Sequence, residues 1–234
     1  MLATRRTLVG FGLALLGLVA LGTAATVVDA RNSEPVDVAR ALRDVVSDAA
    51  GAAVFISLLL GLLVSTWEYR HRTMTHSVLA APRRDRLLAA KASVGFVLGL
   101  LLAAVGAVLS LAIAVPWLGS DAPGELGGAD LLARVGQLLA GAGLWGVLGV
   151  AVGALVTSQV GAVISSLVWL LIVEPVLGAL PGPVAPYLPS HAMQALLGSD
   201  TGDLSAGGGL GIVLAYLAVF GAVAVVTTQQ RDIS

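Results

Sequence analysis

Six long stretches of this chain contain almost no charged side chains, and they constrain its fold more than any other feature. They are residues 8–28, 50–67, 92–117, 131–156, 160–180 and 210–227. A helix of about 20 apolar residues crosses the roughly 30 Å hydrocarbon core of a bilayer. A water-soluble domain would need charged residues for its surface, whereas 12% of this chain is charged and 57% is hydrophobic. The sequence therefore predicts an all-α, polytopic membrane protein: a six-helix bundle that forms a single domain over residues 1–234.

The first of these stretches has two interpretations. Arg5 and Arg6, followed by an apolar run and the small residues 22–25, resemble a secretory signal peptide. The apolar core of a signal peptide is about 7–15 residues long, however, and this run is longer. We therefore favour a retained membrane helix, and an even number of spans then places both termini on one side.

The basic residues of the connecting segments indicate which side that is. One side carries nine of them: Arg5, Arg6, Arg70, Arg72, Arg83, Arg84, Arg86, Lys91 and Arg231. The other side carries four: Arg31, Arg40, Arg43 and Arg134. Short loops rich in Lys and Arg stay in the cytoplasm. We therefore expect cytoplasmic termini, outer loops at 29–49, 118–130 and 181–209, and an inner loop at 68–91. Since Arg strongly predominates over Lys, a bacterial plasma membrane is the expected location.

Two of the outer segments have a pattern of their own. Residues 33–49 place apolar and charged side chains on opposite faces of a helix, which predicts a helix that lies on the outer surface or extends the second span outward. Residues 181–189 are rich in proline and predict a rigid, non-helical loop. Ser190 could then cap a short helix that ends at Leu197 and rests at the membrane interface.

Several classes of chemistry are missing from the chain. Cysteine is absent, which excludes disulfides, thiolate metal sites and cysteine nucleophiles. The single lysine, Lys91, is followed by Ala92, so the chain has no Gly-x-x-x-x-Gly-Lys-Ser/Thr loop for ATP. None of the three histidines lies in a predicted span. We therefore expect no catalytic residue, cofactor or metal site, and the net charge of −1 gives no argument for a nucleic-acid partner.

Glu174 is the one carboxylate that lies deep in a predicted span, and Pro175 follows it. A carboxylate at the bilayer centre costs a few kcal/mol, so this position requires an explanation. In one interpretation Pro175 ends the helix near the outer headgroups and Glu174 is solvated. In the other, Glu174 makes a polar contact on a pathway or gating surface.

Small residues four positions apart predict close helix packing. The pairs are Gly95 with Gly99, Ala142 with Gly146, and Gly149 with Gly153. The pattern does not identify which helices meet.

The most specific segment of the sequence is the inner loop, residues 68–91. It begins with Glu68-Tyr69-Arg70 and Thr73, and Pro82-Arg83-Arg84, Arg86 and Ala90-Lys91 follow. A basic loop that attracts anionic lipid would account for the arginines, but it does not account for this order of residues. The order resembles that in the permeases of type-2 ABC exporters. The turn between spans four and five and the segment from Trp169 to Pro189 are also similar to that family.

The resemblance implies that residues 68–91 hold a coupling helix that docks on a cytoplasmic ABC ATPase subunit. Glu68, Tyr69 and Arg70 would anchor this loop, and Arg83, Arg84 and Arg86 would face acidic ATPase surface or lipid phosphates. ATP and Mg would bind to the ATPase, and two permeases, as a homodimer or a heterodimer, would line the pathway. Arg72, where the family often has Gly, and the few residues before the first span depart from the family pattern.

We therefore expect a transport subunit that is not itself an enzyme. Its pathway walls are apolar, so an amphiphilic or hydrophobic cargo is expected. Two alternatives stay open: a self-contained secondary transporter or channel that relies on Glu174, and a non-transporting membrane scaffold.

Overall fold

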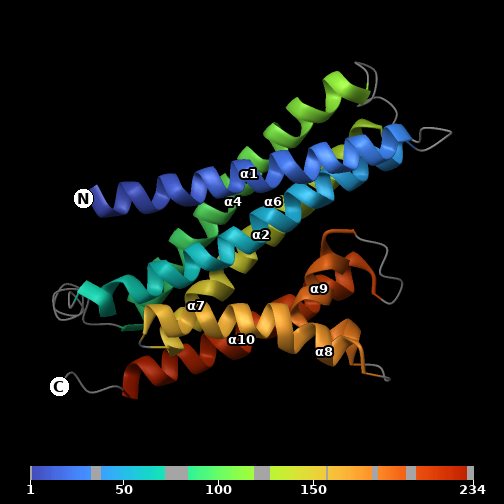
Figure 1. The fold of residues 1–234 in the computed structure, drawn as a ribbon. Helices are drawn as coiled ribbons and strands as arrows, with labels where there is room; N and C mark the ends of the chain where they lie inside the picture. Colours follow the sequence, from blue (N-terminus) through green and yellow to red (C-terminus); the bar gives the residue numbers. More distant parts are fainter. Residues whose placement is uncertain are drawn as a thin grey trace.

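The computed structural model describes residues 2–32, 38–71, 84–118, 127–156, 158–180, 184–198 and 204–230. Nearly all of these residues lie in helices (Figure 1). Within them, six helical segments are long and apolar enough to cross a membrane, which confirms the prediction of an all-α, multi-pass protein. Both termini lie at the same end of the bundle (Figure 1).

The helices follow one another along the chain as a simple series. Their bounds are α1 (Leu2–Asn32), α2 (Val38–His71), α4 (Arg84–Leu118), α6 (Gly128–Leu155), α7 (Gln159–Val168), the π-helix η1 (Trp169–Val173), α8 (Glu174–Gly178), the 3-10 helix η2 (Ala185–Tyr187), α9 (Pro189–Leu196) and α10 (Ala206–Gln230). The elements α7, η1 and α8 together make the fifth span, Gln159–Gly178. Ser158 caps α7 by accepting a hydrogen bond from the Gly161 N–H at 3.2 Å, as expected of a tight polar turn.

The expected outer loop at 29–49 is wrong, because helices occupy most of it. The helix α1 continues to Asn32 and α2 already begins at Val38, well before the expected start of the second span. Leu42, Val45 and Ala49 are completely buried, so the apolar face of this segment packs inside the bundle. Of the two interpretations of the amphipathic segment, extension of the second span is therefore the correct one. The charged residues on the other face of this segment do not prevent the packing, because the apolar face is the one that other helices cover.

The centre of the bundle is formed by α2, α4 and α6, which approach one another closely at glycines. A Cβ atom on Gly61 would lie 2.1 Å from the carbonyl oxygen of Gly146, and one on Gly99 would lie 2.3 Å from that of Ala142. A Cβ on Gly149 would lie 2.2 Å from the carbonyl oxygen of Leu58. No side chain fits in these places, so backbone packs on backbone. The small-residue pairs therefore do mark close packing, and the structure identifies the partners.

Two buried serines add hydrogen bonds between α2 and α6. The Ser57 hydroxyl donates to the carbonyl oxygen of Ala142 at 2.6 Å, and the Ser65 hydroxyl donates to that of Val150 at 2.8 Å. Such bonds between membrane helices contribute about 1 kcal/mol each. They fix the register of α6 along α2 at two points.

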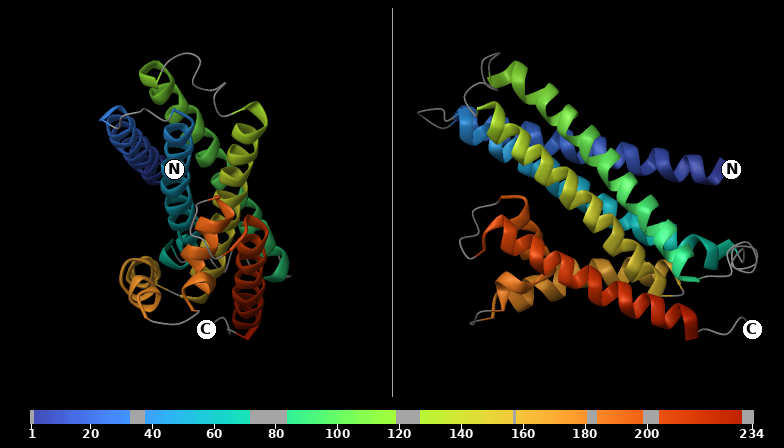
Figure 2. Two further views of the ribbon diagram at one scale, coloured as in Figure 1. Left: turned by 90° about the vertical axis from the view of Figure 1, so that its right-hand side faces the viewer. Right: turned by 180° about the vertical axis from the view of Figure 1, so that it is seen from behind.

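The elements after α6 form a second group beside this centre (Figure 2). The short helix α9 packs tightly on α10, because a Cβ on Gly209 would lie 2.4 Å from the carbonyl oxygen of Ala192. It also contacts α6, where Met193 and Leu197 meet Gly141. Contacts between α10 and α6 and between α7 and α2 complete the join. The expected short helix is confirmed, but it packs inside the protein as well as lying near one end.

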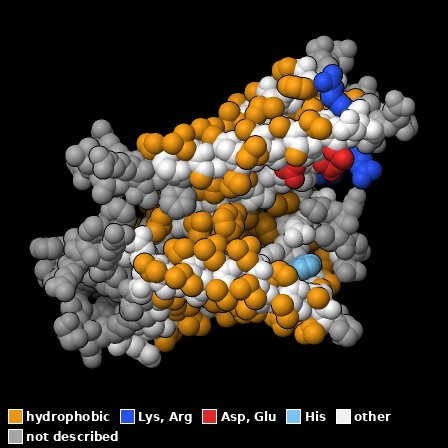
Figure 3. Space-filling model, viewed as in Figure 1, with side chains coloured by type: hydrophobic (Ala, Val, Ile, Leu, Met, Phe, Trp, Pro, Cys, Tyr) orange, Lys and Arg blue, Asp and Glu red, His pale blue; other side chains and the backbone are white. Residues whose placement is uncertain are grey.

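Apolar side chains cover the outward faces of α1, α4, the fifth span and α10. Leu13, Leu101, Leu171 and Val219 are among the exposed ones. Figure 3 shows apolar side chains along the length of the molecule, with described Lys, Arg, Asp and Glu side chains gathered near one end. This distribution suits a surface in contact with lipid hydrocarbon.

We predict that Gly146→Ala destabilises the bundle, whereas Gly136→Ala on the same helix does not. A Cβ at Gly146 would lie 2.4 Å from the Gly95 carbonyl oxygen, so α4 and α6 would have to separate, at a cost of about 2 kcal/mol. A Cβ at Gly136 meets nothing within 4 Å, and alanine favours helix by up to about 1 kcal/mol. Thermal unfolding of the detergent-solubilised variants would measure both effects. Equal midpoints for the two variants would contradict the packing described above.

Candidate functional site

An apolar cleft of about 320 Å³ lies between the central helices and the second group. Its walls come from α2, α6, α7, η1, α9 and α10, through residues that include Leu58, Trp145, Leu148, Val152, Trp169, Leu170, Pro189 and Phe220. Its polar lining consists of Ser165, Ser166 and Tyr216, and no lining residue is charged. The Tyr216 hydroxyl donates a hydrogen bond to the carbonyl oxygen of Tyr187 at 3.0 Å. Such a cleft can accommodate an apolar group or a hydrocarbon chain.

The helix beside this cleft contains a π-helical turn, η1, which ends two residues before Pro175. At its end the Glu174 N–H bonds to the carbonyl oxygen of Trp169, five residues earlier. Proline has no N–H to donate, and its ring clashes with the carbonyl group of a regular helical turn before it. The wider turn makes room for the ring, and the helix continues as α8 to Gly178. Pro175 therefore does not end the span.

Glu174 is buried and linked to α9. Its side chain is 1% exposed. One carboxylate oxygen accepts a hydrogen bond from the backbone N–H of Ser190 at 2.5 Å, and the other accepts one from the Ser190 hydroxyl at 2.7 Å. The first residues of a helix have backbone N–H groups without partners in the helix, and an acidic group satisfies them well. Glu174 thus caps α9 from a different helix.

These contacts exclude the solvated interpretation of Glu174 and correct the expectation for Ser190. Glu174 is not solvated at a helix end, because the helix passes through Pro175 and the carboxylate is enclosed. Its polar contacts are made with Ser190 of the protein itself, and they do not test a role on a pathway or gating surface. Ser190 does not cap its own helix: Leu188 occupies the cap position, and the Ser190 hydroxyl bonds to Glu174.

The residues of the expected coupling loop lie partly within two helices. Glu68, Tyr69 and Arg70 belong to the last turn of α2, and Arg84, Arg86 and Lys91 belong to the first turns of α4. Thr73, Pro82 and Arg83 lie outside the described residues. The end of α2 and the start of α4 lie at the same end of the bundle as both termini (Figure 1). The topology therefore gathers the described part of this motif at one end.

Sequence reasoning missed the cleft and the partner of Glu174. The cleft combines residues from α2 to α10, which no local pattern connects. The signal for Glu174 was present, since a buried carboxylate needs hydrogen-bond donors. The sequence pattern predicts that Ser190 caps its own helix and gives no sign that its hydroxyl bonds to Glu174.

Among the described residues, no group of three or more His, Asp or Glu side chains could hold a metal ion.

No family model, no curated protein and no solved structure matches this chain.

We predict that Glu174 and Ser190 are energetically coupled. Glu174→Ala removes both hydrogen bonds and leaves a cavity, and should destabilise the protein by about 3 kcal/mol. Ser190→Ala removes one bond and should cost about 1–2 kcal/mol, and the double variant should cost less than the sum. Thermal unfolding in detergent, with hydrogen exchange at the α9 amides, would measure the coupling.

Ser93→Ala is the matched control for this cycle. The Ser93 hydroxyl is exposed and bonds to the Ala89 carbonyl oxygen of its own helix, so its loss should change stability by less than about 0.5 kcal/mol. Additive effects of the Glu174 and Ser190 substitutions would show that the two side chains are not linked.

Proposed function

We propose that this chain is the membrane-spanning permease subunit of an ATP-binding-cassette exporter. The observation that carries the proposal is the position of the motif in residues 68–91. Its described residues lie at the ends of α2 and α4, at the end of the bundle that also holds both termini. The bias of basic residues favours the cytoplasm for this end, where an ATPase subunit would bind. ATP and Mg belong to that partner, and a second permease, identical or homologous, completes the transporter.

The packing of α2 against α4 and α6 would transmit a movement at this end of the bundle to the cleft. The helix α2 carries Glu68, Tyr69 and Arg70 at its end and is joined to α4 and α6 along its length by glycine contacts. Because backbone packs on backbone there, these three helices would move as one body. The cleft lies between this body and the second group. A push on the end of α2 would then widen or narrow the cleft.

The lining of the cleft supports the proposed class of cargo. Its walls are apolar, with three hydroxyl-bearing side chains and no charge. An ion would lose its hydration there without gaining ligands, whereas an apolar or amphiphilic molecule would gain contacts. We therefore propose a hydrophobic or amphiphilic cargo that moves out of a bacterial cell.

The hydrogen bonds of Glu174 give less support to a secondary transporter that relies on this residue. A coupling carboxylate has to exchange a proton or an ion during transport. Both oxygens of Glu174 already accept hydrogen bonds from Ser190, and neither Glu174 nor any other acidic residue lines the cleft. A membrane scaffold without transport activity is the other alternative, and the experiment below separates all three.

The orientation can be tested because the natural chain has no cysteine. In whole cells, Ser120→Cys should react with a membrane-impermeant maleimide, whereas Ser77→Cys should react only after the membrane is opened. The reason is that residues 118–130 connect spans on the expected outer side and residues 68–91 on the inner side. The reverse pattern would place the termini outside and would remove the basis for a cytoplasmic ATPase partner.

The exporter proposal predicts that the chain co-purifies with an ATPase subunit encoded by a neighbouring gene. We expect Glu68→Ala combined with Arg70→Ala to reduce ATP-dependent transport by about tenfold or more, because ion-paired contacts at an interface contribute several kcal/mol. Arg40→Ala combined with Asp44→Ala, which likewise removes one basic and one acidic side chain but at the opposite end of α2, should leave transport unchanged. Both quantities would be measured in proteoliposomes.

Three results would each contradict the exporter proposal in a different way. Transport that requires a proton gradient and is lost on Glu174→Gln, while the complex stays intact, would indicate the secondary transporter. A chain that neither moves cargo nor binds an ATPase would indicate the scaffold. Full transport by the variant with Glu68→Ala and Arg70→Ala would show that this motif is not the coupling surface.

A further inference from the structure

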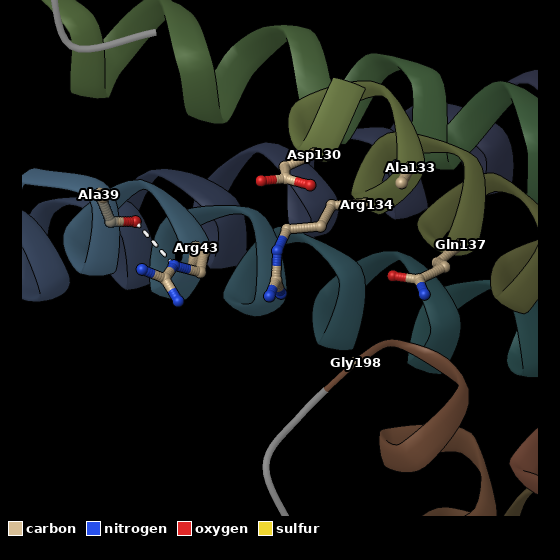
Figure 4. Close-up of a pocket in the computed structure, with 7 residues that line it drawn as sticks. All are labelled: Ala39, Arg43, Asp130, Ala133, Arg134, Gln137 and Gly198. Carbon is tan, nitrogen blue, oxygen red and sulfur yellow. Dashed lines mark hydrogen bonds between the residues drawn. The ribbon is translucent and has the colours of Figure 1, made fainter. Parts of the chain in front are cut away.

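A second cavity, of about 390 Å³, lies at the end of the bundle opposite the termini. The first turns of α2 provide Arg43, the first turns of α6 provide Asp130, Arg134 and Gln137, and the turn after α9 provides Gly198. Three segments that are far apart in the sequence thus converge here. Figure 4 shows the guanidinium groups of Arg43 and Arg134 on the same side of the cavity, with Asp130 above them.

Two cations of this cavity lack an acidic partner in the described part of the chain. Arg43 donates from Nε to the carbonyl oxygen of Ala39 at 3.2 Å, which leaves its terminal nitrogens for another acceptor. The described residues provide no ion pair to Arg43 or Arg134 within 4.0 Å, although Asp130 lies nearby. Arg40, three residues before Arg43, differs, because it pairs with Asp44 at 3.8 Å.

The floor of the cavity requires a glycine. Gly198 has φ of +75°, a left-handed conformation that other residues rarely adopt. A Cβ there would lie 3.2 Å from Gln137 Oε1 and 3.6 Å from Arg134 Nη1. The turn after α9 can therefore approach these two side chains closely without filling the cavity.

The position and the chemistry of the cavity identify a class of ligand. The spans that contribute Arg43 and Arg134 begin at Val38 and Gly128, so both side chains lie within a few turns of the membrane surface. Two guanidinium groups match the oxygens of a phosphate, each through paired N–H donors. Asp130 would then face a hydroxyl or ammonium donor on the same ligand.

We propose that this cavity binds a phosphate group that carries a neighbouring hydrogen-bond donor, as the headgroup of a phospholipid such as phosphatidylglycerol does. A soluble phosphate ester has the same chemistry and is the alternative source. The site is independent of the exporter proposal, because it rests on Arg43 and Arg134 and on no residue of the 68–91 motif or the cleft.

The test is phosphatidylglycerol binding to the purified full-length chain in detergent, measured by native mass spectrometry. We expect one tightly bound phosphatidylglycerol per chain, and weaker binding of phosphatidylcholine, whose headgroup has no donor for Asp130. The double variant with Arg43→Gln and Arg134→Gln should bind phosphatidylglycerol at least about tenfold more weakly, the effect of losing two charge-assisted contacts. Arg40→Gln is the control: it removes one charge from the same end of α2, outside the cavity lining, and should bind as the natural chain does.

Further arms of the experiment make each result decisive. Competition by glycerol 3-phosphate that also depends on Arg43 and Arg134 would assign the site to a soluble phosphate ester, and lack of competition would assign it to lipid. If the double variant does not fold, the variant with Arg43→Lys and Arg134→Lys keeps the charge and should still bind several-fold more weakly, because lysine cannot make paired contacts. The proposal would be overturned if the variant with Arg43→Gln and Arg134→Gln bound phosphatidylglycerol as tightly as the natural chain. It would also be overturned if Arg40→Gln weakened binding as much as that double variant does.

Discussion

The close approach of α2, α4 and α6 is the constraint on which the rest of the structure depends. Lipid tails are as apolar as leucine, so burial of leucine gives little force to join helices within a bilayer. Contact between backbones provides it instead, and it needs glycine at the points where Gly61, Gly99 and Gly146 meet neighbouring carbonyl groups. Glycines on the outward faces, such as Gly12 and Gly221, meet nothing within 4 Å and have no such role. The content of 29 glycines is therefore informative only at particular positions.

The elements after α6 pack against the centre that α2, α4 and α6 form. The second group is joined to the centre mainly where α10 packs on α6 and α7 packs on α2, and Glu174 ties α9 to the fifth span through both of its oxygens. The π-helical turn before Pro175 belongs to the same arrangement, since it lets the helix continue past the proline and carry Glu174 into the protein. An acidic group inside a membrane span therefore acts here as a cap for a neighbouring helix.

Three regions of different chemistry are arranged along the bundle. One end carries the residues of the 68–91 motif, the middle holds an apolar cleft, and the other end holds a cavity with two arginines. Gly141 of α6 contacts Met193 and Leu197. Along α6 it lies between the residues that line the cavity and those that line the cleft. This order suits a protein that handles molecules with both an apolar and a charged part.

The sequence by itself determined the class of fold, because the preference of a residue for lipid is a local property that adds up along each span. The six spans, the short helix near residue 190 and the close packing at Gly95, Gly146 and Gly149 all follow from such local patterns. The tertiary structure decided where helices begin, which partner Glu174 has and which side chains share a cavity. The segment before Ala50 is helical because its apolar face is covered by neighbouring helices, and Glu174 is stable because Ser190, 16 residues later, supplies two donors. These outcomes depend on which distant residues meet, and hydropathy and spacing carry no record of that.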